Sequence, residues 1–266
     1  MNTPALLETR ALTVKIAGKC VCRDFNLTLS AGTCMGILGA NGVGKTTLLH
    51  TLAGLRTPQS GDVLLEGKPL GSLPRRHIAR RLGLLMQQQE DSLPATVLET
   101  ALIGRHPHID FWRWESHADV AVARRALKAV GLEGLEQRPQ TMLSGGERRR
   151  LAIATILAQD PAVYLLDEPA QQLDLHHQLA LLGRFAGLAR APGRALIMSL
   201  HDVNLAVRHC SHILMLFGDG ETLLGSATEL LTPGNLSRLF GTGIRELDWE
   251  GGRLFVPAPH RGEQRT

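Results

Sequence analysis

The chain has few aromatic residues: Phe, Trp and Tyr together make up 4% of its 266 positions. Leu, Val, Ile and Ala must therefore fill the core that an apolar content of 44% predicts. No apolar run approaches the ~20 residues that a membrane-spanning helix requires. The first residues also lack the basic start and long apolar core of a signal peptide. We therefore expect a soluble, cytosolic chain with one large α/β domain, or one domain with an inserted subdomain.

Cysteine is also scarce, and no two of the four cysteines form a C-x-x-C pair with zinc-ligand spacing. We therefore predict no structural zinc site, and we expect free thiols in a reducing compartment. The eleven histidines are scattered, with no carboxylate or cysteine at ligand spacing. Apart from His201, discussed below, we interpret them as surface or structural residues.

The excess of positive charge is small, with a net charge of +4 and a pI near 9.1. Arginines cluster at residues 75–81 and 148–150, and such clusters can contact nucleic acid or anionic lipid. Because RNA-binding aromatic residues and a long basic tail are missing, we predict no nucleic-acid partner. We interpret the clusters as solvated helix faces, and the run Arg148-Arg149-Arg150 receives no specific role.

Strand and helix patterns alternate over most of the chain. Residues 6–30 read as two strands about a turn at Gly18. Further short apolar strands are expected at residues 35–38, 62–66, 82–86, 162–166, 195–200 and 213–217. Helical patterning without strands fills residues 91–140, which predicts an inserted helical subdomain, and residues 244–256 predict a terminal hairpin. Alternation of strands and helices elsewhere predicts a parallel sheet with helices on its faces.

The most specific motif is G-x-x-x-x-G-K-[ST], which is filled by Gly39, Gly44, Lys45 and Thr46. An apolar strand precedes it and a helix follows, so backbone N–H groups and the helix dipole can bind phosphate. Lys45 can reach the β- and γ-phosphates, and the Thr46 hydroxyl can ligate Mg²⁺. We therefore predict that the protein binds a nucleotide. The expected contacts are Gly39, Ala40, Asn41, Gly42, Val43, Gly44, Lys45, Thr46 and Thr47.

The apolar strand at residues 162–166 ends in two carboxylates, Asp167 and Glu168. Because ligands bind at the carboxyl ends of strands in a doubly wound sheet, Asp167 should lie beside the Mg²⁺ held by Thr46. Glu168 should lie where a water attacks the nucleotide. Together with the phosphate loop, this pair predicts hydrolysis of the nucleotide rather than binding alone.

A second anion-binding feature is predicted where a serine and two glycines open a helix. One chain thus carries two phosphate-binding loops but one conventional nucleotide pocket. We infer a head-to-tail pair in which the second feature of each chain covers the nucleotide of the other. A twofold axis closes such a pair into a homodimer. The residues expected to act across it are Leu143, Ser144, Gly145, Gly146 and Glu147.

These motifs resemble those of the ATP-binding subunits of ABC transporters. The resemblance rests on the phosphate loop, the LSGGE stretch, the LLDEP strand and the SLHD stretch, in that family's order. It implies an ATPase that uses ATP and Mg²⁺, with Asp167 and Thr46 as Mg²⁺ ligands. It also implies that Gln87 links the Mg²⁺ and the water to a transmembrane partner, and that His201 contacts the γ-phosphate. Asp174 is expected to face the opposite subunit.

The implied fold is α/β: a P-loop NTPase (RecA-like) core with a mainly parallel sheet, an antiparallel β subdomain and an inserted helical subdomain. Residues 1–266 would form a single ABC ATPase domain. Within it, residues 1–87 and 159–240 form the nucleotide-binding core with its β subdomain. Residues 88–158 form the helical subdomain with the LSGGE signature, and residues 241–258 form a C-terminal β ribbon.

Residues 104–108, GRHPH, are similar to the G-R-x-P-[HWY] stretch of importers for iron–siderophores, haem and cobalamin. Overall similarity points most closely to the hemin-import group. The resemblance implies a peripheral subunit on the cytoplasmic face of the inner membrane, which drives a permease dimer supplied by a periplasmic substrate-binding protein. Because the ATPase need not touch cargo, we do not interpret His106 and His108 as haem ligands. We expect them near the docking helix of the permease.

Departures from the family pattern at Val14 and at residues 170–172 bear on function, whereas those at Ala40 and Thr46 are benign. The family usually stacks an aromatic residue on adenine, and we assign that position to Val14. Weaker base packing and modest nucleotide selectivity follow, with an ATP preference over GTP below about a hundredfold, since a lost stack removes roughly 0.5–1.5 kcal/mol. Residues 170–172, Ala-Gln-Gln, replace the commoner Thr-Ser-Ala, so we expect altered hydroxyl contacts beside Asp174.

Two other functions stay open. A soluble ABC ATPase could serve a scaffold, ribosome or DNA-repair assembly, although such proteins usually have tandem cassettes or long coiled-coil insertions. A small-molecule phosphotransferase could use the same phosphate loop, but it would need an acceptor pocket and lid in place of LSGGE. Co-purification with a membrane protein tests the first function, and ATP hydrolysis without an acceptor tests the second.

Overall fold

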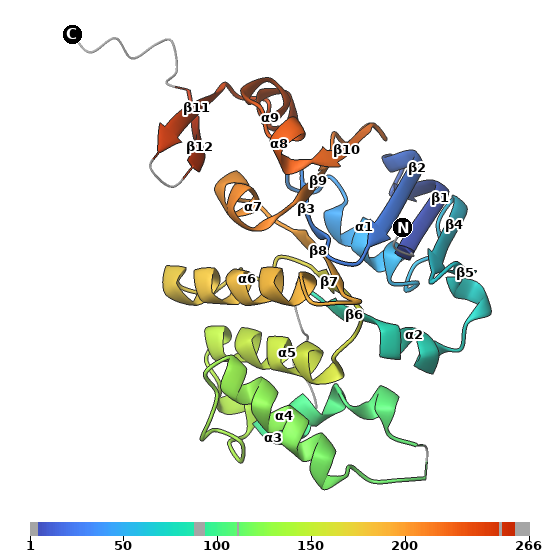
Figure 1. The fold of residues 1–266 in the computed structure, drawn as a ribbon, viewed down its shortest axis with the longest axis vertical. Coiled ribbons are helices and arrows are strands. Elements are labelled where there is room, and N and C mark those ends of the chain that lie inside the picture. The colour runs from blue at the N-terminus through green and yellow to red at the C-terminus, as the bar shows by residue number, and fades with distance from the viewer. Residues whose placement is uncertain (1–4, 88–93, 111, 250–251, 259–266) are drawn as a thin grey trace.

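Three sheets organise the protein in the computed structural model, which describes residues 5–87, 94–110, 112–249 and 252–258 (Figure 1). An antiparallel sheet has the strand order β2-β1-β4-β5, and a larger sheet has the order β10-β9-β3-β8-β7-β6. The strands of the antiparallel sheet are β1 (Ala5–Ile16), β2 (Lys19–Ser30), β4 (Ser60–Leu65) and β5 (Lys68–Pro69). Those of the larger sheet are β3 (Cys34–Leu38), β6 (Leu82–Leu85), β7 (Val163–Leu166), β8 (Ala195–Ser199), β9 (His212–Leu216) and β10 (Thr222–Ser226). The third sheet is the hairpin of β11 (Ile244–Trp249) and β12 (Gly252–Pro257).

The larger sheet is parallel except at its edge, where β10 pairs antiparallel with β9. Its parallel strands are largely buried, as a parallel sheet covered on both faces requires. Residues along β3 alternate between two core clusters: Cys34 and Leu38 face one, and Met35 and Ile37 face the other. The second cluster also holds residues of β1 and β2, so the antiparallel sheet and α1 (Lys45–Leu52) cover that face. The predicted α/β fold with its antiparallel β subdomain is confirmed.

Helices cover the opposite face and extend beyond the sheet (Figure 1). The remaining helices are α2 (Arg75–Arg81), α3 (Val97–Ile103), α4 (His117–Ala129), α5 (Gly145–Gln159), α6 (Leu175–Ala189), α7 (Val203–His209), α8 (Ala227–Leu230) and α9 (Pro233–Phe240). Helices α3, α4 and α5 pack on one another. Each of the three begins with a capping box, in which a Ser or Thr and an acidic residue three positions later satisfy each other's backbone N–H.

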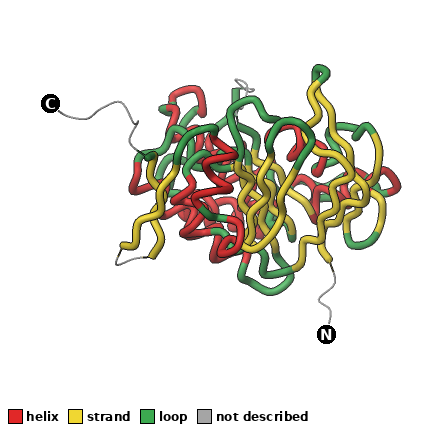
Figure 2. Tube along the Cα trace, turned by 90° about the horizontal axis from the view of Figure 1, so that it is seen from above, coloured by secondary structure: helices red, strands yellow, loops and turns green. Residues whose placement is uncertain are grey.

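The hairpin of β11 and β12 lies beside α7 and at the opposite end of the molecule from β1 and β2 (Figures 1 and 2). Asn204 on α7 attaches it, because its side chain accepts from Phe255 N at 2.8 Å and donates to Phe255 O at 3.1 Å. The predicted terminal hairpin is therefore present. Its expected turn includes Gly251, which lies outside the described residues, as does the start of the predicted helical region at Asp91.

The patterning assigned nothing to residues 218–243, where the structure has β10, α8 and α9. In the part of the chain that the structure describes, every helix is too short or too polar to cross a bilayer.

Candidate functional site

The predicted phosphate loop connects the end of β3 at Leu38 to the start of α1 at Lys45. Gly44 has a φ of 111°, and a Cβ there would come within 2.5 Å of the Val21 side chain. A Cβ on Gly39 would come within 2.8 Å of the Leu216 carbonyl oxygen. Both positions therefore need glycine for packing, and Gly44 needs it for its backbone conformation as well.

Lys45 is 5% exposed at the start of α1. Its Nζ donates to the carbonyl oxygens of Gly39 at 2.8 Å and Ala40 at 3.2 Å, so the ammonium group lies inside the turn of the loop. Burial lowers the pKa of Lys45, and the carboxylates of Glu168 and Asp167 oppose that shift. The Lys45 ammonium group thus lies near both the residues that follow β3 and the carboxylates that follow β7.

Asp167 and Glu168 follow β7, as the sequence predicts. Asp167 is fully buried, and its Oδ1 accepts from Ser199 Oγ at 2.6 Å. The same Ser199 hydroxyl oxygen accepts from Glu168 N at 2.8 Å, so the neighbouring strand β8 orients both acidic residues. Asp167 Oδ2 has no hydrogen-bond partner among the described residues.

Glu168 lies between the two other predicted catalytic side chains. Gln87 Nε2 donates to Glu168 Oε2 at 3.0 Å, and His201 Nε2 contacts Glu168 Oε1. Gln87 follows β6 and His201 follows β8, so the ends of three adjacent strands supply this cluster. Glu168 has a φ of 46°, a left-handed conformation that costs a non-glycine residue of order 1–3 kcal/mol. Its backbone and side chain are therefore held in one orientation by neighbours on both sides.

A cavity of about 420 Å³ joins the phosphate loop to this cluster. It is lined by Ile16, Asn41, Gly42, Gly44, Lys45, Thr46, Thr47, Gln87, Glu168, Gln171 and His201. Three further predicted residues, Gly39, Ala40 and Val43, belong to the loop but do not line the cavity. Gly39 and Ala40 bind the Lys45 ammonium group through their carbonyls, and a Cβ on Gly39 would meet the side chain of Val43 at 2.9 Å.

The assignment of the adenine-stacking position to Val14 is wrong. Val14 is 1% exposed and belongs to the core, whereas Ile16, at the end of β1, lines the cavity. Register shifts in the pairing of β1 with β2 precede and follow Val14, and a period-two pattern does not reveal such irregularities. Gln171 also lines the cavity, although the sequence marks it only as a departure from the family pattern and not as a site residue.

The predicted signature residues lie elsewhere in the chain. Ser144 is the N-cap of α5, where its Oγ accepts from Glu147 N at 3.2 Å and Glu147 Oε2 accepts from Ser144 N at 2.8 Å. Gly146 lies against residue 172, because a Cβ there would be 3.4 Å from the Gln172 carbonyl oxygen. Among the described residues, none of Leu143 to Glu147 lines the cavity. The chain therefore keeps the phosphate loop and the predicted signature residues apart.

Asp174 begins α6 as its N-cap. Its carboxylate accepts from His177 N at 2.9 Å, a backbone hydrogen bond that lowers the pKa of Asp174, and it lies 2.8 Å from His177 Nδ1. The carboxylate itself is exposed, with a relative side-chain exposure of 67%. The side chain is therefore at the protein surface, with its carboxylate bound to His177.

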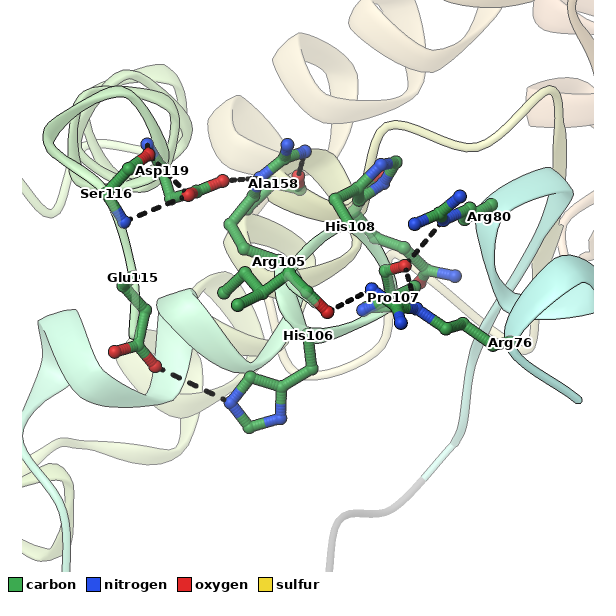
Figure 3. A network of polar contacts seen from close by, with 12 residues as sticks. Arg76, Arg80, Arg105, His106, Pro107, His108, Glu115, Ser116, Asp119 and Ala158 are labelled. Atoms are coloured by element: carbon green, nitrogen blue, oxygen red, sulfur yellow. Dashed lines mark hydrogen bonds and ion pairs between the residues drawn. The ribbon is translucent and has the colours of Figure 1, made fainter. Parts of the chain in front are cut away.

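The GRHPH stretch connects the α3–α5 group to the rest of the protein (Figure 3). Arg105 bonds to Asp119 at 3.0 Å and to the Ala158 carbonyl at 2.9 Å. His108 Nε2 lies 2.9 Å from the carbonyl of Gln159, and His106 lies 3.8 Å from Glu115. The two rings point to different partners.

The arginines of α2 are not a purely solvated face, contrary to expectation. Arg76 and Arg80 donate to the Pro107 carbonyl at 2.9 and 2.6 Å, which ties α2 to the GRHPH stretch (Figure 3). Arg75 donates to the carbonyl of Gly54, and Arg81 pairs with Glu66.

The sheet order, the phosphate loop and the acidic residues at the end of β7 define a P-loop nucleotide-binding protein. Residues 22–171 match the family model described as ABC transporter. The chain therefore belongs to the ABC transporter family.

Individual relatives support this conclusion. A hemin import ATP-binding protein of Myxococcus xanthus is 38% identical, with 94% of this chain and 96% of the relative covered. A ferric enterobactin transport ATP-binding protein of Escherichia coli is 37% identical, with 95% and 94% covered. A cobalamin import ATP-binding protein of Halobacterium salinarum is 35% identical, and the chain spans 59% of its length.

Solved structures show the same fold. An ABC transporter of metal-chelate type in an inward-facing conformation has a chain that is 27% identical, with a TM-score of 0.82 and 96% of this chain and 98% of that chain covered. A dimeric ATP-binding cassette bound to ADP and phosphate is 25% identical, with a TM-score of 0.72 and 83% and 98% covered.

Proposed function

We propose that this protein is the ATP-hydrolysing subunit of a membrane importer for haem, an iron chelate or cobalamin. The observation that carries the proposal is the position of Glu168, held between Gln87 and His201 at the wall of the cavity that the phosphate loop opens into. Relatives named for hemin, ferric enterobactin and cobalamin transport support the cargo class. Hemin is the cargo that we favour within it.

The loop and Lys45 bind the triphosphate in this proposal. The backbone N–H groups of residues 39–47 and the N-terminus of α1 attract the phosphates, and Lys45 exchanges two carbonyl oxygens for charged phosphate oxygens. That exchange favours the bound state, because hydrogen bonds between charged groups are stronger than those to neutral carbonyls.

The residues present also fit a Mg²⁺ ion. Asp167 Oδ2 is buried and unpartnered among the described residues, and hard oxygen ligands are what Mg²⁺ prefers. Mg²⁺ is usually bound through one or two carboxylates together with substrate phosphates, so a single buried carboxylate is a sufficient protein anchor. We propose that Asp167, Thr46 and Gln87 hold it, and that it neutralises phosphate charge.

Glu168 acts as the general base for the attacking water. Its 8% exposure limits access of solvent, and the contacts from Gln87 and His201 fix the carboxylate before ATP binds. Once ATP is bound, His201 turns to the γ-phosphate and Gln87 to the water. Positioning and charge stabilisation then carry most of the catalysis, as in other P-loop enzymes.

A second copy of the chain completes the site in this proposal. Residues Leu143 to Glu147 lie outside the cavity of their own chain, and the exposed Asp174 is available to a neighbour. A homodimer around two ATP molecules would bring Ser144 and Gly146 of each chain onto the nucleotide of the other. Residues 88–158, as a helical subdomain, would then move with each cycle of closure and hydrolysis.

The proposed partners follow from this motion. The dimer drives a transmembrane permease dimer from the cytoplasmic face of the inner membrane, and a periplasmic substrate-binding protein delivers cargo to the permease. We propose that the permease contacts the protein near the GRHPH stretch; the contacts of this stretch with α2, α4 and the end of α5 would pass a displacement there to all three helices (Figure 3).

Uptake by vesicles that contain the chain and its permease tests the proposal. We expect ATP-dependent accumulation of hemin, a ferric siderophore or cobalamin, and none with Lys45→Ala. Absence of any co-purifying membrane protein, with ATP hydrolysis intact, would instead support a soluble ABC ATPase that serves another assembly.

A further inference from the structure

Arg149 lies inside the protein, although it belongs to a run of three arginines that look alike in the sequence. It is 6% exposed, whereas Arg148 beside it is exposed and Arg150 reaches the carbonyls of Val130 and Gly131 at the surface of α4. A buried guanidinium group needs a partner for every N–H, because an unmet donor inside a protein is costly. Its partners therefore indicate its role.

Five carbonyl oxygens surround the Arg149 guanidinium, which has five N–H groups. The acceptors are the carbonyls of Met86 at 2.6 Å, Gln87 at 3.2 Å, Asp167 at 2.7 Å, Glu168 at 2.7 Å and Pro169 at 3.4 Å. They belong to the two loops that follow β6 and β7, and these loops carry Gln87, Asp167 and Glu168. One side chain of α5 thus holds the backbones of both loops.

We infer that Arg149 is a positioning residue for hydrolysis, which aims Glu168 and Gln87 by fixing the backbone of both loops from the signature helix. The inference rests on the proposed roles of those two residues. Glu168 adopts a left-handed backbone, which persists only where neighbours hold it. Ser199 Oγ holds its N–H and Arg149 holds its carbonyl, so the strained peptide is fixed on both sides.

The same contacts connect the signature residues at the start of α5 to the loops that carry Gln87 and Glu168. Ser144 begins α5 and Arg149 lies one turn and a half further along it. A shift of α5 on closure of the dimer is therefore transmitted to Glu168 and Gln87 through one rigid, planar group. Lysine can replace it only in part, because an ammonium group has three donors for five acceptors.

The experiment measures turnover and nucleotide affinity of Arg149→Met, Arg149→Lys and the matched control Arg148→Gln. We expect Arg149→Met to lower kcat by about 10²-fold, the loss that a small misplacement of catalytic groups produces. ATP affinity should stay unchanged, because Arg149 does not line the cavity. Arg149→Lys should be intermediate, and Arg148→Gln should match the parent.

A double-mutant cycle separates positioning from a structural role. If Arg149 acts through Glu168, Arg149→Met should cause little further loss of single-turnover hydrolysis in a Glu168→Gln background. The same fractional loss in both backgrounds, or a parental kcat for Arg149→Met, would overturn the inference. If Arg149→Met does not fold, the cycle is run with Arg149→Lys. Parental turnover of Glu168→Gln alone would instead refute the proposed function of Glu168.

Discussion

At the scale of single residues, Ile16 is the side chain from β1 that reaches the cavity. An isoleucine can contact a purine base, but it lacks the stacking energy of an aromatic ring. We expect Ile16→Tyr to tighten ATP binding by roughly 0.5–1.5 kcal/mol. The parent should prefer ATP over GTP by less than about a hundredfold. Titration with a fluorescent ATP analogue, displaced by ATP or by GTP, measures both affinities.

Val14→Ala is the control for this substitution. Because Val14 is buried away from the cavity, its truncation should lower stability and leave ATP affinity unchanged. If Val14→Ala lost ATP affinity while the ATP affinity of Ile16→Tyr stayed unchanged, Val14 and not Ile16 would be the residue that contacts the base.

Residue-scale features were predictable only where a motif specifies them. The glycines, Lys45 and the acidic pair after β7 follow from spacing, since few backbones other than a phosphate loop need that pattern. The burial of Arg149 was not assigned, although a signal exists: Ala152, Ile153 and Ile156, at i+3, i+4 and i+7, are all buried. Because three arginines stand in a row, composition alone does not show which of them is buried.

At the scale of elements, the capping boxes offer a matched pair. Ser116 and Ser144 begin α4 and α5 with the same reciprocal bonds to an acid three residues on. Each Ser→Ala change should cost about 1 kcal/mol of stability, the usual loss for an N-cap. If Ser144 also acts on the nucleotide, only Ser144→Ala should lower ATP turnover. Unfolding in urea measures the loss of stability in each variant, and an ATPase assay measures turnover. Equal turnover in the two variants would contradict the proposed role.

The elements themselves were largely predictable where patterns are strong. Apolar strands that end in glycine or acidic residues predicted β3 and β7, and helical periodicity predicted the α3–α5 region. Residues 218–243 were unassigned because the elements there are short: β10 has five residues, with Gly225 among them, and α9 has eight. Pro233, the first residue of α9, is a helix-start signal that could have revealed this helix. The edge position of β10 further weakens its signal, since an edge strand is less uniformly apolar.

At the scale of the whole molecule, the separation of the cavity from Ser144 predicts association. With MgATP, Glu168→Gln should accumulate as a dimer, because hydrolysis no longer reopens it. Sedimentation velocity would show this, and a bulky Gly146→Trp change in the same background should return it to monomer. A dimer that survives Gly146→Trp, or that forms equally without nucleotide, would contradict closure through the signature residues.

The central claim is that Glu168 activates the water and is not needed to hold ATP. The most direct test compares ATP turnover and ATP binding of the purified parent with those of Glu168→Gln. We predict that turnover falls about 10²- to 10⁴-fold while ATP remains bound with parental affinity. Turnover at the parental rate would contradict the account.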